Sequence, residues 1–481
     1  MGLDRRGFTL GLGAAGLLAG SPALARGVRS AKPARGLDVI VLGAGISGLN
    51  TACLLEQQGL RVAVIEGRQR VGGRIMTLLD QPGYPEMGFN SMAAGYGRGI
   101  DAAKRAGVEL VDVAPRYRIG PPPALYINGK PLNREEWARH PANPFPEAMK
   151  SMMPAEVVSV LVARNTPLKD WTQWADAANA PLDVSLHAFL SAQGLSEAAI
   201  RLANDVSPYY GTNAHDVSAL MLEFNDGFVK AQATAGPQSL AVKGGNLLLP
   251  QAMARQLKGD VMLGREVVAI DTTATGATVT CADGASFSAG RVVCSLPFST
   301  LRLVSITPGL TGVQARGVTT MPYQPLSIAF LTATAPFWEE DGIAPGMWTD
   351  GTVGTVMPQR FGATDQAITG FTVQARGALA HYWDAMGKDG ALAYVIAGIE
   401  AMRPAARGKL RGVAYFSWVG ERFNLGDWAY FSPGQVAGVM GEIAKPVGRL
   451  HFCGEHTATG ARGLEGALES SERVALEVLS A

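Results

Sequence analysis

One segment near the start of the chain, residues 39–74, limits the fold more than any other feature. It begins with an apolar run, Val39–Leu42, which has the pattern of a strand buried on both faces of a parallel sheet. Three glycines spaced as G-x-G-x-x-G follow at once, at Gly43, Gly45 and Gly48. A helical pattern and a second apolar run come next. The segment therefore predicts one βαβ unit with a phosphate-binding turn.

Each glycine of this turn has a separate physical role. Gly43 permits the tight turn, Gly45 lets the backbone approach a pyrophosphate, and Gly48 lets the helix pack closely on the strand. The helix N-terminus offers unpaired N–H groups and the positive end of its dipole to the anion. Glu66 ends the second strand about 20 residues further on, where a carboxylate can accept ribose hydroxyls. The expected contacts in the turn are Gly43, Ala44, Gly45, Ile46, Ser47 and Gly48.

A glycine pair and an arginine just after the acid, Gly72-Gly73-Arg74, extend the predicted site. The βαβ unit alone does not distinguish NAD from FAD. Backbone at the glycine pair and a guanidinium beside it can reach a second part of a long cofactor, and we expect Arg68 in the same stretch to contribute. The pattern resembles the FAD-binding segment of the flavin amine oxidase family, and this resemblance favours FAD.

Composition indicates a large globular protein. The chain has 481 residues, of which 47% are hydrophobic and 17% charged, so it can bury a core large enough for two or more domains. Its 42 basic and 41 acidic residues give a net charge of +1, and the sequence contains no basic stripe. We therefore expect no nucleic-acid partner.

The first residues predict a targeting segment that is not part of the fold. Arg5-Arg6 precedes an apolar run over residues 10–20, and the pattern resembles a twin-arginine export signal. Ala23-Leu24-Ala25 fits a cleavage site, so we expect a signal peptide over residues 1–25, cleaved after Ala25, and a linker over 26–36. The expected location is periplasmic or secreted, with the twin-arginine translocase as a partner during export. An uncleaved anchor and an ordinary amphipathic tail are the alternatives.

Cysteines and histidines form no ligand-spaced set in the sequence. Cys281 and Cys294 flank an expected hairpin and could pair in an oxidising compartment, although two separate thiols are favoured. The sequence contains neither CxxC nor HExxH, so we expect no metal. The six histidines are His140, His187, His215, His381, His451 and His456.

Strand patterns of the nucleotide-binding type occur at the start, middle and end of the chain, with helical and β-rich segments between them. We expect an α/β fold in which a Rossmann-like FAD-binding domain is interleaved with a helical and β-rich substrate-binding domain of α+β type. A pocket is expected where the two domains meet. The expected FAD-binding domain comprises residues 37–97, 237–305 and 445–481, and the substrate-binding domain comprises 98–236 and 306–444.

Near the C-terminus, Phe452–Thr457 and Gly463–Ser470 resemble the last cofactor-binding element of flavin amine oxidases, a family that includes monoamine, polyamine and L-amino-acid oxidases. The resemblance covers most of the chain and is most specific at its two ends. A helix that begins near Gly463 would aim its N–H groups at the reduced flavin, which carries negative charge. The residues implied in FAD binding are Val267, Gly454, Glu455, Gly463, Leu464 and Ala467.

Members of this family bind the amine between two aromatic side chains in front of the flavin. The resemblance puts Trp428 in one wall, where its face can orient an amine by cation–π contact, and makes Tyr430 a weaker candidate for a catalytic role. Asp427 stands where some members attach the flavin through a cysteine, so the FAD should be non-covalent. The position of the other aromatic corresponds to Gly463 and Leu464, which predicts a half-open cage.

The resemblance implies oxidation of an amine or amino acid to an imine, by hydride transfer to flavin N5, with O2 as acceptor and H2O2 as product. The matching strand, Leu326–Leu331, lacks the lysine that assists the reaction with oxygen in many members. A periplasmic amine dehydrogenase that passes electrons to a redox protein is therefore an alternative. A C–C desaturase of the same fold and a non-enzymatic flavin-binding redox partner are further alternatives. The expected partner is a small-molecule amine, and a homodimer is a possible assembly.

The amine itself is left open by the sequence. An amino-acid oxidase would need an arginine in the pocket to bind the substrate carboxylate. The sequence offers Arg116, Arg118, Arg360 and Arg376, and spacing does not select among them.

Overall fold

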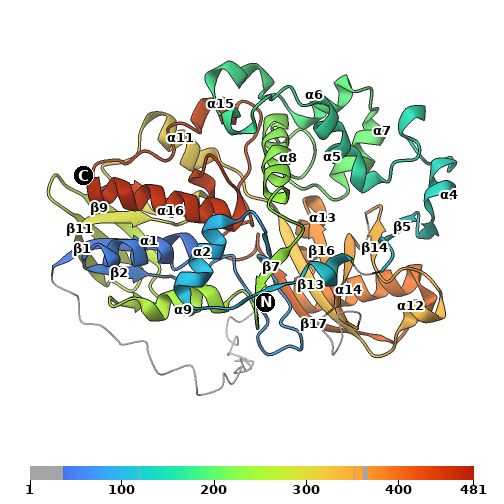
Figure 1. Cartoon of the computed structure of the whole chain (residues 1–481), viewed down its shortest axis with the longest axis horizontal. Coiled ribbons are helices and arrows are strands. Elements are labelled where there is room, and N and C mark those ends of the chain that lie inside the picture. Colours follow the sequence, from blue (N-terminus) through green and yellow to red (C-terminus); the bar gives the residue numbers. More distant parts are fainter. Residues whose placement is uncertain (1–35, 119, 352, 361–366, 481) are drawn as a thin grey trace, which may run out of the picture.

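The computed structural model describes residues 36–480 except residues 119, 352 and 361–366. The expected signal peptide, and all but the last residue of the expected linker, lie outside these residues. Two large sheets occupy the two ends of the molecule, one built around β1 (Leu37–Leu42) and the other around β13 (Leu326–Ala333) (Figure 1). No helix within the described part of the chain is long and apolar enough to cross a membrane.

The first sheet contains the predicted βαβ unit. β1 pairs in parallel with β2 and with β11, and β11 pairs in parallel with β18, so segments from the start, middle and end of the chain lie side by side. The core-facing run of β1 is fully buried, as its apolar sequence predicts. In order across the sheet, the strands are β12 (Ser305–Thr307), β9 (Val267–Thr272), β10 (Ala277–Cys281), β11 (Ser286–Cys294), β1, β2 (Val62–Ile65) and β8 (Val261–Met262), with β18 (Leu450–Phe452) also paired to β11.

Four helices pack together over this sheet. α1 (Ile46–Gln57) contacts α16 (Gly463–Ser480) and α9 (Leu248–Gln256), and α2 (Gly97–Ala106) contacts α9 and α16 (Figure 1). One apolar core joins β1 to α1 and α16. The two predicted cofactor-binding segments, one near each end of the chain, are therefore neighbours in space.

The strands of the second sheet are β17 (Leu410–Ser417), β13, β16 (Ile368–Arg376), β15 (Thr355–Arg360), β14 (Met347–Thr349), β5 (Ala124–Ile127) and β6 (Lys130–Leu132), in that order. Two helices pack on this sheet near its β17 edge: α13 (Ala378–Ala385) contacts β13 and β16, and α14 (Gly387–Met402) contacts β17 and β13. A small antiparallel sheet consists of β3 (Met92–Ala93), β7 (Ser239–Val242) and β4 (Leu110–Asp112). In sequence, its strands fall where the chain passes from one large sheet to the other.

The remaining elements are mostly helices, and those between residues 154 and 233 pack on an aromatic core that includes Trp174 and Phe224. They are α3 (Ala114–Arg118), α4 (Arg134–Ala138), α5 (Pro154–Asn165), α6 (Leu186–Ala192), α7 (Glu197–Ile200), α8 (Ala219–Ala233), α10 (Phe298–Leu301), α11 (Gly312–Thr320), α12 (Phe337–Glu340) and α15 (Gln435–Val439). Short 3₁₀ turns occupy Glu147–Met149, Trp171–Gln173, Ala177–Leu182, Pro404–Ala406 and Glu455–Thr457, and a π-helical turn occupies Arg201–Asp205.

Each of the two large sheets takes its strands from different parts of the chain. The strands of the first sheet come from the segments expected to bind FAD, apart from the last residues of β12. The strands of the second sheet come from the segments expected to bind substrate. The small sheet crosses the expected boundary at residue 98, because β4 pairs with β7.

Hairpin register separates Cys281 from Cys294. In the antiparallel pair of β10 and β11, Thr280 lies opposite Ser286, so Cys281 is near the start of β11 while Cys294 is its last residue. Both cysteines are buried and free. The favoured reading of two separate thiols agrees with this geometry.

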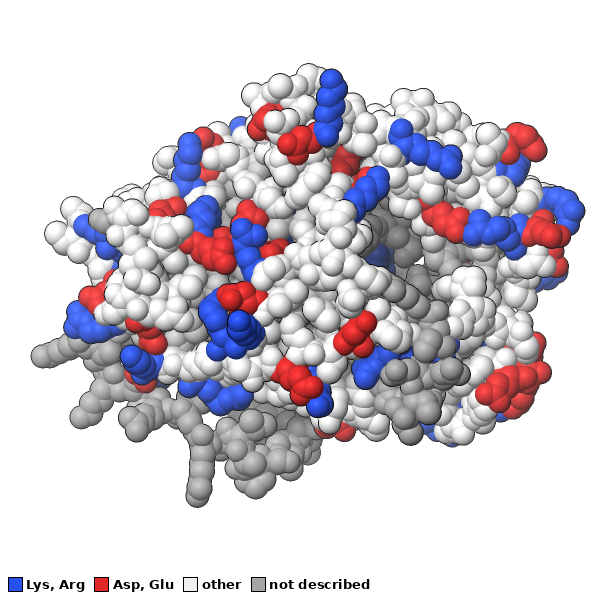
Figure 2. Space-filling model, viewed as in Figure 1, with Lys and Arg blue, Asp and Glu red and all other residues white. Residues whose placement is uncertain are grey.

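Charged side chains of both signs are interspersed over the face of the molecule drawn in Figure 2, which carries no continuous basic stripe. The 42 basic and 41 acidic residues of the chain are therefore not separated into one positive and one negative patch on this face.

A buried ion pair fixes the loop after α12 to the end of α14. The guanidinium of Arg403 donates to both carboxylate oxygens of Asp341, at 2.7 and 3.0 Å, and to the carbonyl oxygens of Ile343 and Ala344. It also lies over the ring of Phe337, with Cζ 4.8 Å from the ring centroid. Removal of one partner would leave a buried charge without compensation.

We expect Arg403→Ala to lower the free energy of unfolding of the region built on the second sheet by about 3–5 kcal/mol, because Asp341 would lose its counter-charge inside the protein. Urea and thermal unfolding followed by circular dichroism would measure the change. The matched control is Arg134→Ala, which removes the exposed pair with Glu156 and should cost no more than about 1 kcal/mol. Equal losses in the two variants would contradict this account.

Candidate active site

One cavity runs along the carboxyl ends of the parallel strands in the first sheet and continues toward the second sheet. Its volume is about 430 Å³, within the range of sites for cofactors and small ligands. Residues that follow β1, β2, β11 and β18 line it, and in open α/β sheets this edge is the usual place for a ligand. The sequence-predicted residues that line it are Gly43, Gly45, Ile46, Ser47, Glu66, Arg68, Gly72, Gly73, Arg74, Val267, Trp428, Gly454, Glu455, Gly463, Leu464 and Ala467.

Three predicted residues do not line the cavity: Ala44, Gly48 and Tyr430. Gly48 acts through packing, because a Cβ there would lie 2.1 Å from the carbonyl oxygen of Gly43. The backbone N–H of Ala44 donates to Glu66 Oε2 at 2.9 Å and so orients the carboxylate. Tyr430 is treated with the aromatic wall below.

Backbone geometry that a larger residue would strain shapes the phosphate-binding turn at Gly43, and close backbone contacts shape it at Gly45. Gly43 has a φ of +97°, in the left-handed region. Gly45 and Gly72 form an isolated parallel bridge, and a Cβ on Gly73 would lie 3.2 Å from the Cα of Gly45. The two glycine motifs predicted from the sequence are therefore in direct backbone contact and form one wall of the cavity.

Glu66 is buried at the end of β2 with both carboxylate oxygens already bound. Oε2 accepts from Ala44 N, and Oε1 accepts from Arg68 N at 2.9 Å and from Arg68 Nη1 at 3.4 Å. These donors leave further lone pairs that can accept hydroxyl groups of a ligand. The arrangement fits the expected role of Glu66 at a ribose.

Arg74 links the N-terminal motif to the C-terminal half of the chain. Its Nη1 donates to the backbone oxygen of Asp427 at 2.6 Å and to Glu455 Oε2 at 3.3 Å. Glu455 is buried, and a second guanidinium, that of Arg462, lies 3.9 Å from its other oxygen. Desolvated charges of this kind persist only when they are paired, so the three segments are held in register.

Among the described carboxyl groups that line the cavity, Asp427 has the most strongly shifted pKa. Burial raises the pKa of its carboxyl to about 7, an effect that Arg74 opposes and that Glu455 reinforces. The side chain is buried and lines the cavity next to Trp428. Its charge therefore changes within the physiological pH range.

The N-terminus of α16 points its first residues into the cavity. Gly463 has a φ of +58°, and Leu464 and Ala467 line the same wall. Glu465 is turned away and accepts from the backbone N–H groups of Arg98 and Gly99, both at 3.0 Å. The positive end of the α16 dipole is thus directed at the cavity, where it would stabilise an anionic group.

The aromatic wall consists of more than the predicted tryptophan. Trp428 stacks on Tyr209, with ring centroids 5.2 Å apart and an angle of 25° between the planes, and its indole N–H donates to the Tyr209 carbonyl. Tyr209 lines the cavity, and 44% of its surface is exposed. Tyr96 also lines this wall. Sequence analysis missed both tyrosines because no local motif surrounds them.

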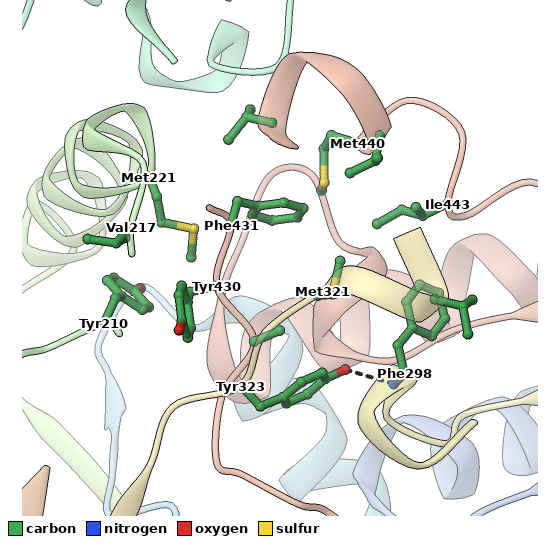
Figure 3. Packing of buried hydrophobic residues seen from close by; sticks show 14 of the residues in the cluster. Tyr210, Val217, Met221, Phe298, Met321, Tyr323, Tyr430, Phe431, Met440 and Ile443 are labelled. Atoms are coloured by element: carbon green, nitrogen blue, oxygen red, sulfur yellow. Dashed lines mark hydrogen bonds between the residues drawn. The ribbon is translucent and has the colours of Figure 1, made fainter. Parts of the chain in front are cut away.

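Tyr430 lies behind the wall in the hydrophobic core. It is 5% exposed and packs beside Tyr210, with ring centroids 6.3 Å apart (Figure 3). The reason is the alternation of an extended segment, in which Ala429 pairs with Tyr323 in an isolated bridge. Its hydroxyl therefore cannot contact a ligand in the cavity without rearrangement, and Tyr430 supports the wall instead of forming it.

An arginine flanks the aromatic pair. The Cζ atom of Arg376 lies 5.4 Å from the ring centroid of Tyr209 and 5.6 Å from that of Trp428. Its Nη2 donates to Gln374, and it makes no ion pair with any residue that the structure describes. Of the four arginines considered from the sequence, this one lies against the predicted substrate wall.

The face of β13 nearest to Trp428 is apolar. Leu326, Ile328 and Phe330 form a buried cluster with Met87 and Trp418, and Trp428 packs against it. The strand that lacks a lysine in the sequence therefore also provides no polar side chain from these alternate positions.

The described residues fit FAD, because one continuous cavity contains the glycines of the phosphate-binding turn, the Glu66 carboxylate for a ribose and the N-terminus of α16. We expect Gly45→Ala to fold normally, since the new Cβ would lie no closer than 4.0 Å to any neighbouring protein atom. The variant should nevertheless lose most of its FAD, because Gly45 lines the cavity where its backbone would approach the pyrophosphate. Absorbance at flavin wavelengths per mole of purified protein measures this. Gly97→Ala is the control, because its Cβ would meet nothing within 4 Å and Gly97 lies outside the cavity lining. Full flavin content in Gly45→Ala would refute the assignment.

Curated relatives match this chain over most of its length. The chain is 25% identical over 472 residues to the putative L-amino-acid oxidase YobN of Bacillus subtilis, covering 92% of this chain and 94% of that protein. It is 26% identical over 482 residues to the flavin-containing amine oxidase B of Homo sapiens, covering 92% and 86%.

Solved structures share the fold. Wild-type putrescine oxidase bound to putrescine superimposes with a TM-score of 0.73 at 24% identity, covering 93% of this chain and 99% of that one. Cyclohexylamine oxidase from Brevibacterium oxydans gives a TM-score of 0.73 at 20% identity, covering 92% and 99%. The family model described as flavin containing amine oxidoreductase matches residues 46–479. Because that match spans most of the chain, the protein belongs to this family and is an FAD-dependent amine oxidoreductase.

Proposed function

We propose that the protein oxidises the C–N bond of an amine or amino acid to an imine, with O2 as the electron acceptor and H2O2 as the product. The observation that carries the proposal is the continuity of one cavity from Glu66, at the ribose end, to the stacked pair of Trp428 and Tyr209. Bound FAD would accept the α-hydrogen of the substrate as a hydride at N5. The imine would then be hydrolysed in water.

The side chains of the cavity have roles of positioning and electrostatics in this scheme. The Trp428 and Tyr209 faces would orient the amine, and the apolar cluster of β13 on which Trp428 packs would keep water from reaching that side of the wall. The N-terminus of α16 would stabilise negative charge that develops at the cofactor. An amine must lose its proton before it can release hydride, so the rate should rise with pH as the substrate deprotonates.

The charge beside the aromatic pair favours a substrate with a carboxylate. Arg376 forms no direct ion pair with a described residue, although the Asp427 carboxyl acts on its charge through space. A guanidinium binds a carboxylate strongly and repels a second ammonium group. Asp427 offsets this charge only in part, because its pKa of about 7 leaves much of it neutral at physiological pH. We therefore favour an amino acid over a diamine.

Non-covalent attachment of FAD follows from the residue beside Trp428. Asp427 stands where some family members carry a cysteine, and a carboxylate is a much weaker nucleophile than a thiolate. Acid precipitation should therefore release free FAD into the supernatant. We also propose export by the twin-arginine route with cleavage after Ala25, which rests on the sequence pattern of residues 1–25 alone.

A dehydrogenase that passes electrons to a periplasmic redox protein is the second candidate. The apolar face of β13 favours it, because Ile328 and its neighbours provide no cationic group to assist oxygen. Both candidates share the oxidation of the C–N bond and differ only in the acceptor.

We expect anaerobic mixing with amino acids to bleach the flavin, and air-saturated buffer to restore its colour rapidly. The decarboxylated amine of each amino acid serves as an internal control for Arg376→Gln. This variant should raise KM for amino acids by about tenfold or more and change KM for the amines little. Stopped-flow absorbance measures both half-reactions. Reoxidation too slow for turnover would favour the dehydrogenase, and a flavin that no amine or amino acid bleaches would refute both candidates.

The pKa of Asp427 predicts a pH-dependent difference between the wild type and Asp427→Asn. Below about pH 7 the carboxyl is neutral and the two enzymes should behave alike; above it, the ionised carboxylate attracts a substrate that arrives as an ammonium. The ratio of wild-type to variant kcat/KM should therefore rise about threefold or more between pH 6 and pH 8. Steady-state rates across this range measure it, and a constant ratio would contradict the assignment.

A further inference from the structure

Three side chains that are distant in sequence meet on the surface of the helical region. His187 lies in α6, Glu197 begins α7, and His215 lies in the loop before α8. His187 Nε2 and Glu197 Oε1 are 2.8 Å apart, and the two imidazole rings stack with centroids 3.9 Å apart and planes inclined by 18°. One ligand atom from each of the three residues lies within 4.8 Å of the other two.

This set of donors is one that transition metals prefer. Two imidazole nitrogens and a carboxylate suit zinc and its neighbours in the first transition row, which bind such atoms at about 2.0–2.2 Å. Ligand atoms around one ion then lie roughly 3–4 Å apart, so small rotations of these side chains would bring all three into range. Glu197 and His215 are exposed, so water can complete the coordination.

A hydrogen bond explains the pairing of His187 with Glu197 but not the position of His215. The cluster lies outside the cavity and contains none of its lining residues. The spacing of 28 residues between the histidines gave no sign of it in the sequence, because the contact depends on how the loop folds back on α6.

His215 of the cluster lies on the same loop as Tyr209 of the aromatic wall. The backbone N–H groups of Leu186 and His187 donate to the carbonyl oxygens of Val217 and Ala214, both at 2.9 Å, which fastens this end of the loop to α6. At the other end, the Trp428 indole donates to Tyr209 at 3.1 Å. A ligand shared by His187, Glu197 and His215 would fix the loop further and so restrict Tyr209.

We propose that His187, Glu197 and His215 form a binding site for one divalent transition-metal ion of the zinc type, and that its occupancy stabilises the loop that carries Tyr209. The site is structural and regulatory, because it lies apart from the cavity. It is independent of the identity of the substrate.

Isothermal titration of the FAD-loaded full chain with Zn²⁺, after removal of metals with a chelator, tests the site. We expect one equivalent to bind, and His187→Ala, His215→Ala and Glu197→Gln each to weaken the affinity by about tenfold or more. His381→Ala is the matched control, since His381 is an exposed histidine on α13 outside the cluster. Undetectable binding by the wild type, or equal binding by all variants, would overturn the proposal.

Two further measurements separate loss of ligands from loss of folding and test the link to the loop. Electron paramagnetic resonance of the Cu²⁺-loaded protein should show hyperfine coupling to two imidazole nitrogens in the wild type and to one in His215→Ala, whose flavin absorbance should be unchanged. Zn²⁺ should lower KM for the best substrate in the wild type by about twofold or more and leave His215→Ala unaffected. An identical copper spectrum in the variant would overturn the site, and a KM unaffected by Zn²⁺ would overturn its action on the loop.

Discussion

The shape of the cavity depends on the hydrogen bonds and the ion pair that the Arg74 guanidinium makes. Arg74 lies next to the glycine pair of the N-terminal motif, yet it donates to the backbone of Asp427 and to the carboxylate of Glu455, which are 353 and 381 residues away in sequence. Each of these partners is buried, and buried charges are costly unless they are paired. One side chain thereby joins the glycine pair, the segment that carries Trp428 and the turn Glu455–Thr457 near the C-terminus.

Opposite charges alternate along the cavity, and this order suits an oxidation that moves negative charge. Glu66 and Glu455 are each bound to an arginine, so their charges are compensated where the cofactor would bind. Arg376 and Asp427, beside the aromatic pair, are not bound to each other. The fixed charges therefore belong to the cofactor end, while the charges that can respond to a substrate or to pH gather at the other end.

The parts of the site that the sequence could predict are those with local backbone requirements. The turn at Gly43–Gly48, the pair Gly72-Gly73 and the start of α16 at Gly463 depend on φ values or close approaches that only glycine permits, so residue type alone reveals them. The interleaved arrangement of the sheets follows from where those motifs and the strand patterns fall along the chain.

The rest could not be predicted, because tertiary contacts decide it. Tyr209 joins the wall through a loop with no regular pattern, and Tyr430 is turned into the core by a single residue of alternation next to Trp428. Residues 186–205 form α6, α7 and a π-helical turn instead of one continuous helix, and His187 lies near Glu197 across the break between α6 and α7. The chain has no local signal for such meetings.

The conformation of Gly463 bears on the position where the resemblance to the family places the second aromatic of the cage. A Cβ at this position would meet no atom within 4 Å, so there is room for a large side chain. Yet its φ of +58° costs an ordinary L-residue about 1–2 kcal/mol, and the same backbone begins the helix that faces the cofactor. An aromatic introduced at Gly463 would therefore have room for its Cβ but would strain the start of the helix that faces the cofactor.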